Sequence, residues 1–164
     1  MEDPIAKAAQ VGGYIGCFGY AGVAILSEAP LDTLVKQFSR MYNIGKTSSP
    51  PLAVATTLCN GFSAYQSRSK DAVIGGLASP FVLYVAAAIS VMAIVPFTLL
   101  YMEPAVNRKL LGLGSHASRG VKAEHLGASE EDVRKLLIRW KGLNFVRAAL
   151  AGLGALLAAV ATVA

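Results

Sequence analysis

The sequence predicts an all-α integral membrane protein, a four-helix bundle with a short amphipathic helix before the second and the fourth span. Of the 164 residues, 54% are hydrophobic and only 15% are charged, whereas an average soluble domain has about 25% charged residues. Four segments approach or exceed the roughly 20 residues of helix that cross a bilayer core. Lys and Arg lie mostly between these segments, as membrane insertion requires. We expect one domain over residues 1–164.

The first predicted span covers residues 8–27, which contain no charged residue. Gly12 and Gly16 form a GxxxG pair that would let another helix approach closely in lipid. A secretory signal peptide is the alternative, because Lys7 precedes the apolar run. The glycines and the acidic start of the chain argue against that alternative.

The second predicted span covers residues 48–67 and is the most polar of the four. Pro50 and Pro51 are expected in its first turn, where a missing N–H costs nothing. An amphipathic helix over residues 33–45 should lead into it. Asn60 would not face lipid, so we expect it inside the bundle, either in contact with another helix or lining a substrate cavity.

The third predicted span, residues 76–102, lies in a run without charge. Pro80 suits its start, and Pro96 should kink it because the proline ring removes a backbone hydrogen bond. The fourth span, residues 143–163, carries alanines four residues apart that predict a narrow packing stripe, namely Ala151, Ala155 and Ala159.

The polar segment between these two spans should start as an irregular loop, because Gly112, Gly114 and Gly120 interrupt it. Ser129 followed by acidic residues predicts a helix start. Apolar residues then recur at helical spacing opposite basic ones. We expect an amphipathic helix in the headgroup region, after which the chain turns inward.

Several function classes are excluded by composition and motifs. The net charge of +5 does not indicate nucleic-acid binding, because the basic residues lie between apolar segments. The nucleotide, zinc-protease and hydrolase motifs are missing. His116 and His125 have no neighbouring Cys, and Cys17 and Cys59 lack CxxC spacing. We therefore predict neither a metal site nor a bound cofactor.

One polar constellation remains at the predicted membrane surface. If the third and fourth spans are antiparallel neighbours, their ends meet, and Glu103 could pair with Arg147. The loop before the second span lies on the same face and adds Tyr42. The group then comprises Tyr42, Lys46, Tyr101, Glu103, Asn107, Arg108, Trp140, Asn144 and Arg147. It is either a structural ion pair with interfacial aromatic anchors or a polar substrate pocket.

The ordered motifs resemble the anthrone-oxygenase-like family of small membrane proteins from fungal polyketide pathways. They are Phe38, Tyr42 and Gly45 ahead of Pro50-Pro51-Leu52, then Tyr101-Met102-Glu103-Pro104-x-x-Asn107, then Trp140-x-x-x-Asn144-x-x-Arg147. Together they cover nearly the whole chain. Family members often carry His where this chain has Asn144.

This resemblance implies oxidation of an anthrone-type aromatic polyketide to an anthraquinone by dioxygen, without metal or flavin. Glu103 or Tyr42 would take the proton, and Arg147 or Asn144 would stabilise the enolate. Asn107 would be a further catalytic residue, and Trp140, Tyr101 and Asn60 would bind substrate. The expected setting is a multi-pass protein of a fungal endoplasmic reticulum, in contact with lipid and able to form homo-oligomers. The competing hypothesis is a non-catalytic membrane scaffold or a small transporter component.

Overall fold

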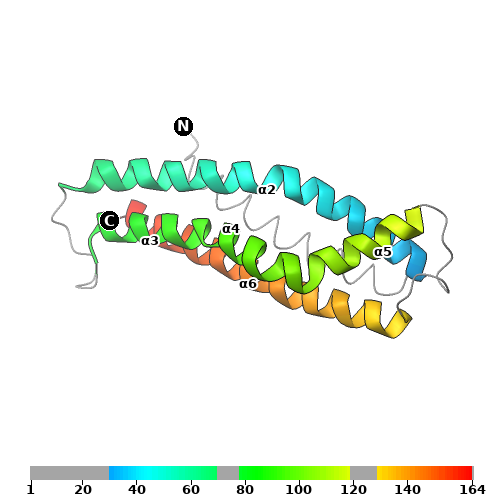
Figure 1. Ribbon diagram of the computed structural model, residues 1–164. Helices are drawn as coiled ribbons and strands as arrows, with labels where there is room; N and C mark the ends of the chain where they lie inside the picture. The colour runs from blue at the N-terminus through cyan, green and yellow to red at the C-terminus, as the bar shows by residue number, and fades with distance from the viewer. Residues whose placement is uncertain (1–29, 70–77, 119–128, 164) are drawn as a thin grey trace. The chain divides into compact units, whose positions relative to one another are not determined.

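The computed structural model describes residues 30–69, 78–118 and 129–163, and the predicted first span, 8–27, lies outside them. The described residues are almost entirely helical (Figure 1). In chain order the elements are α2 (Leu31–Ser67), α3 (Pro80–Met92), α4 (Ile94–Phe97), the π-helix η1 (Thr98–Asn107), α5 (Arg108–Ser118) and α6 (Glu130–Thr162). The all-α prediction is therefore confirmed.

The chain divides into two compact units, and α2 and α6 contribute to both. Unit 1 contains the described residues 50–69, 78–95 and 147–163. Unit 2 contains the described residues 30–49, 96–118 and 129–146. Each unit has its own hydrophobic cluster, so each is described by itself.

Unit 1 has a core of small residues and one tyrosine. Ala64, Tyr84, Ala87, Ala158 and Ala161 are buried together, and the Tyr84 hydroxyl lies 2.9 Å from the Thr162 hydroxyl. The hydroxyl of Ser90 on α3 donates to the carbonyl of Leu150 on α6 over 2.9 Å. Small residues let these two helices approach closely enough for a side chain to bond directly to backbone.

The small-residue stripe on α6 differs from the predicted one. Gly154, Ala158 and Ala161 are buried, whereas Ala159 is exposed. A β-carbon at Gly154 would lie 2.7 Å from Val91 Cγ2, so any larger residue there would force Val91 to shift. The prediction of Ala159 in the packing stripe was wrong because this glycine fixes which face of α6 meets α3.

Unit 2 has a larger and more varied core. Its members are Leu31, Leu34, Val35, Phe38, Met102, Val106, Leu110, Val133, Leu137 and Trp140. They come from α2, η1, α5 and α6, at spacings of three or four residues along each helix. The described charged residues are concentrated in the same unit, and only Arg68 and Arg147 lie in the described part of unit 1.

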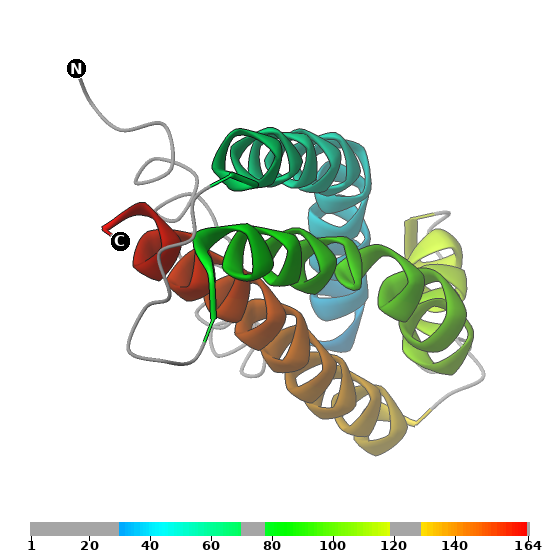
Figure 2. The same cartoon turned by 90° about the vertical axis from the view of Figure 1, so that its left-hand side faces the viewer.

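Three predicted interruptions are wrong. Pro50 and Pro51 lie inside α2 and not in its first turn, because the helix already begins at Leu31, where apolar side chains pack in unit 2. The glycine-containing segment after residue 107 forms α5. Finally, the predicted change of chain direction between the amphipathic and the apolar part is absent from α6, which is one continuous helix (Figure 2).

Gly114 explains why α5 forms despite its glycines. A β-carbon at Gly114 would overlap Ser39 Oγ and lie 2.8 Å from the carbonyl oxygen of Val35, so glycine lets α5 pack directly on α2. Packing of an apolar face can outweigh the poor helix propensity of glycine. Gly112 faces open space.

Two proline predictions are consistent with the structure. Pro80 lies in the first turn of α3, which Ser79 precedes as the N-cap. The helix is interrupted at Ala93, three residues before Pro96, and continues as α4 and η1. A proline cannot donate the backbone hydrogen bond that would otherwise continue the helix through this turn.

Ser129 begins α6 as predicted. Its hydroxyl accepts a hydrogen bond from the Asp132 backbone N–H over 3.1 Å and donates to the Asp132 carboxylate over 2.7 Å, which is a capping arrangement at the positive end of the helix. The hydrogen bond from the Ser129 hydroxyl lowers the pKa of the Asp132 carboxyl. Asp132 lies outside the apolar segment of α6, which starts at Leu143.

Two helical stretches in the described residues are long and apolar enough to cross a membrane, Pro80–His116 and Glu130–Thr162. Only 22% and 17% of their most apolar windows are buried, so neither resembles the core helix of a soluble protein. They include residues 80–102 of the third predicted span and 143–162 of the fourth. The four-span bundle itself stays a prediction.

Candidate active site

The π-helix η1 carries three of the predicted site residues, Tyr101, Glu103 and Asn107. Its backbone hydrogen bonds run from residue i+5 to residue i, as from the Arg108 N–H to the Glu103 carbonyl. π-helical turns are rare and often mark functional sites. Here Pro104 lies inside the element, where its missing N–H already weakens an α-helical ladder.

Within unit 2, Tyr42, Glu103 and Asn107 form a hydrogen-bonded triad. The Tyr42 hydroxyl donates to Glu103 Oε2 over 2.7 Å, and Asn107 Nδ2 donates to the same oxygen over 3.1 Å. Both bonds are complete when Glu103 is a carboxylate. Among the described residues none bonds to Glu103 Oε1, so two donors hold one carboxylate oxygen and none holds the other.

Asn107 is 1% exposed, which makes it the most deeply buried polar residue of the triad. Because its Nδ2 donates to Glu103, its Oδ1 must be the acceptor side of the amide. This oxygen is buried and has no hydrogen-bond partner in the described part of the chain. A buried acceptor without a donor is uncommon and calls for an explanation.

An aromatic cluster adjoins the triad. Phe38 is fully buried and meets Trp140 edge to face, with 5.4 Å between ring centroids. Tyr42, one turn along α2, lies 6.2 Å from Phe38. Phe38 was not predicted as a site residue, although its position four residues before Tyr42 places both on one helical face.

The remaining predicted residues lie in different surroundings. Asn144 Nδ2 donates to the Trp140 carbonyl over 3.2 Å. Arg147 follows three residues later on α6, at the beginning of the unit 1 part of that helix. The proposed Glu103–Arg147 pair therefore stays a prediction, whereas the grouping of Tyr42 with Glu103 is what the structure shows.

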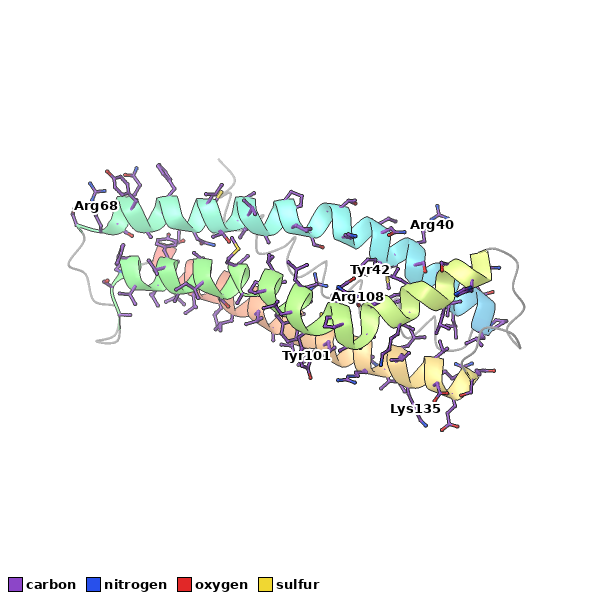
Figure 3. All side chains as sticks on the ribbon, in the orientation of Figure 1. Arg40, Tyr42, Arg68, Tyr101, Arg108 and Lys135 are labelled. Atoms are coloured by element: carbon purple, nitrogen blue, oxygen red, sulfur yellow. The ribbon has the colours of Figure 1, made fainter. Side chains whose placement is uncertain are left out.

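Two predicted substrate-binding residues are not part of the triad. Tyr101 is 50% exposed and stacks on Phe97, with 5.7 Å between ring centroids. Tyr42 lies on α2, and Figure 3 shows Tyr101 on the side of its own helix that faces away from α2. Asn60 belongs to unit 1, where it is 7% exposed, as expected of a residue inside the bundle. Its Nδ2 donates to the Thr56 carbonyl over 3.1 Å.

The described charged residues of unit 2 are mainly basic. In unit 2, Arg40 and Lys135 extend outward from the helices (Figure 3), and Arg108 is exposed. Some basic side chains pair along α6, as Arg134 does with Glu130 over 2.6 Å and Lys135 with Glu131 over 2.8 Å. Within residues 30–69, 78–118 and 129–163 no group of three or more His, Cys, Asp or Glu side chains has a metal-binding arrangement.

Comparison with known proteins decides the family. Residues 38–157 match the family model described as anthrone oxygenase. The chain belongs to the anthrone oxygenase family. Curated relatives include the anthrone oxygenase tpcL of Aspergillus fumigatus, 36% identical over 76% of this chain and 67% of the relative. Another is the anthrone oxygenase nsrD of Aspergillus novofumigatus, 38% identical over the same shares.

A third relative, the anthrone oxygenase ptaC of Pestalotiopsis fici, is 32% identical over 70% of this chain and 74% of its own. No solved structure matches the chain. The family match begins at Phe38 and includes the whole triad, Trp140, Asn144 and Arg147. Membership confirms the predicted resemblance and is consistent with an oxygenase-like enzyme.

Proposed function

We propose that this member of the anthrone oxygenase family is a membrane-embedded, cofactor-independent oxygenase that oxidises an anthrone-type polyketide to an anthraquinone with dioxygen. The observation that carries the proposal is the Tyr42–Glu103–Asn107 triad, in which one carboxylate oxygen is held by two donors and the other is open. The names of the relatives supply the substrate class.

The first step is proton abstraction by Glu103. The central methylene of an anthrone is acidic because its carbanion delocalises into the ketone. Oε1 takes this proton, while Tyr42 and Asn107 hold Oε2 and so fix the direction of the open oxygen. Positioning matters because a general base must lie within hydrogen-bond distance of the proton that it removes.

The negative charge that develops on the ketone oxygen needs a donor or a cation. Asn144 and Arg147 occupy one face of α6, three residues apart, and Trp140 lies one turn earlier, against Phe38. We assign enolate stabilisation to Asn144 and substrate contact to Trp140. The roles predicted from sequence for Arg147, Tyr101 and Asn60 stay predictions. The aromatic surface of Trp140 suits a planar polycyclic substrate.

The oxygen step needs no further reductant. The carbanion gives two electrons to dioxygen, forming a carbon–oxygen bond and, with the proton returned from Glu103, a hydroperoxide. Loss of the second hydrogen from the same carbon as a proton, with departure of hydroxide from the O–O bond, leaves a carbonyl and water. One anthrone and one dioxygen thus give one anthraquinone and one water.

The proposed setting is a four-span, multi-pass protein of an endomembrane such as the endoplasmic reticulum, able to form homo-oligomers. The exposed apolar side chains of unit 1 favour contact with lipid; they include Leu58 and Phe62 on α2, Ile89 on α3, and Leu153 and Leu156 on α6. A lipid-soluble substrate would reach such a protein through the bilayer.

The test is aerobic turnover of an anthrone by protein purified in detergent. Glu103→Gln keeps the size of the side chain but removes the base, so quinone formation should fall by about 10²–10⁴-fold, the contribution typical of a general base. Glu131→Gln is the matched control, because Glu131 is exposed and paired with Lys135; it should turn over normally.

Three results would count against the proposal. Undiminished turnover in a folded Glu103→Gln variant would remove Glu103 from the site. Loss of wild-type activity on treatment with a chelator, with recovery on adding metal, would overturn cofactor independence. Quinone formed no faster than in protein-free buffer would favour the non-catalytic scaffold or transporter component instead.

A further inference from the structure

The buried Oδ1 of Asn107 is an acceptor that the triad does not use. The side chain is 1% exposed, and Nδ2 is engaged with Glu103 Oε2 at 3.1 Å. Because Oδ1 has no partner in the described part of the chain, burying it costs free energy that a bound donor would recover. A ligand group that met this oxygen would therefore be a donor, an O–H or an N–H.

The position of this acceptor relative to the base limits what the donor can be. Asn107 and Tyr42 both bond to the same Glu103 oxygen, so the Asn107 amide lies beside the carboxylate that we propose as the base. The substrate carbon carries only C–H bonds before reaction, and these are poor donors. After oxygen has added, the same carbon carries an O–O–H group, which is a good donor.

We propose that Asn107 Oδ1 accepts a hydrogen bond from the hydroperoxide formed on the substrate, and that this contact holds the intermediate for elimination of water. The inference rests on the proposed function and extends it to the second half of the reaction. Glu103 and Asn107 then have separate roles: Glu103 moves protons and Asn107 binds the terminal peroxide hydroxyl.

The bound geometry favours the elimination step. The hydroperoxide keeps one hydrogen on the reacting carbon. With the peroxide hydroxyl held at Oδ1, that hydrogen can face Glu103 Oε1, which removes it as a proton. The C–H electron pair forms the new carbonyl, the O–O bond breaks, and the departing hydroxide takes up a proton to become water. Without the contact, the hydroperoxide can leave the site unreacted.

The test measures how the product divides between quinone and released hydroperoxide. Asn107→Leu removes both the donor and the open acceptor, whereas Tyr42→Phe removes only a donor to Glu103 Oε2. Both variants should consume substrate more slowly. Only Asn107→Leu should release hydroperoxide, detected by peroxide-specific reduction of the reaction mixture, so that quinone per substrate consumed drops by at least about tenfold.

The outcomes separate this inference from the proposed function. If Asn107→Leu and Tyr42→Phe give the same quinone yield per substrate consumed, the hydroperoxide contact is refuted although Glu103 stays the base. If Glu103→Gln turns over normally, the proposed function fails first. The role of Asn107 is also overturned if Asn107→Leu, Tyr42→Phe and Glu103→Gln all give the same quinone yield per substrate consumed.

A second measurement uses the wild-type protein and does not depend on folding of a variant. Two unreactive anthrones are compared as inhibitors, one with a methyl and a hydroxyl group on the central carbon and the other with two methyl groups. The hydroxyl compound should inhibit about tenfold more strongly, the value of one neutral hydrogen bond to a buried acceptor. Equal inhibition by the two compounds would overturn the inference.

Discussion

Gly114 offers a sharp test of how the helices of unit 2 pack. An alanine β-carbon there would overlap Ser39 Oγ, lie 3.2 Å from Ser39 Cβ and lie 2.8 Å from the Val35 carbonyl oxygen. Ser39 Oγ already donates to that carbonyl over 2.9 Å. The hydroxyl can rotate away, but the backbone oxygen can move only if α5 and α2 separate. Gly112, two residues earlier on α5, has nothing within 4 Å of its β-carbon position.

These contacts give the expected magnitudes. Gly→Ala in a helix adds about 1 kcal/mol of stability where space is open, so Gly112→Ala should be stabilising. Overpacking costs typically about 1–3 kcal/mol, so Gly114→Ala should lie about 1–3 kcal/mol below Gly112→Ala. At about 2–4 °C per kcal/mol for a chain of this length, the two Tm values should differ by about 2–12 °C.

The assay is thermal unfolding followed by circular dichroism in one detergent. Adding Ser39→Ala to Gly114→Ala should recover part of the lost stability, because it removes the overlapping hydroxyl and leaves the clash with the Val35 carbonyl. A Gly114→Ala variant as stable as Gly112→Ala would refute the close packing of α5 on α2.

Two further predictions concern α6. In unit 1, Gly154→Ala should be about 1–3 kcal/mol less stable than Gly152→Ala, because a β-carbon at Gly154 meets Val91 whereas Gly152 faces open space; equal Tm values would contradict this. Ser129→Ala should cost about 1 kcal/mol at neutral pH through loss of the helix cap. The Ser129 hydroxyl lowers the pKa of the Asp132 carboxyl in the folded protein. The stability that comes from the bond between these two side chains is therefore present above the ordinary aspartate pKa. It is lost as the pH falls through the lower pKa of the folded state. The gap between wild type and variant should therefore narrow below about pH 4, and a gap that widened in acid would show that Ser129 does not stabilise the ionised carboxylate.

Much of the fold was accessible from sequence because its determinants are local. The long uncharged runs predicted apolar helices, Pro80 predicted the start of α3, and Ser129 predicted the start of α6. The errors occurred where packing overrides local preference. Pro50 lies within a helix that begins at Leu31, and the glycines after residue 107 lie within α5, because Gly114 fits against α2.

The site was predicted in part for the same reason. The sequence placed the polar residues at the ends of the predicted helices. This placement predicted that Tyr42 and Glu103 lie in the same group. Apart from Pro104, no local pattern indicated the π-helix, and this helix places Glu103 and Asn107 together beside Tyr42. Phe38 was not predicted as a site residue, yet it packs against Tyr42.

Composition and spacing alone determined that this chain is apolar and helical, since these properties depend on which residues are present and how far apart they lie along the chain. The ordered motifs carried a resemblance to the anthrone oxygenases, and the match over residues 38–157 showed the family. Tertiary structure decided which oxygen of Glu103 is held, which amide atom of Asn107 is left open and which face of α6 is packed. The Tyr42–Glu103 bond joins residues 61 positions apart. Contacts of that kind are fixed by the packing of side chains between helices, which no local pattern encodes.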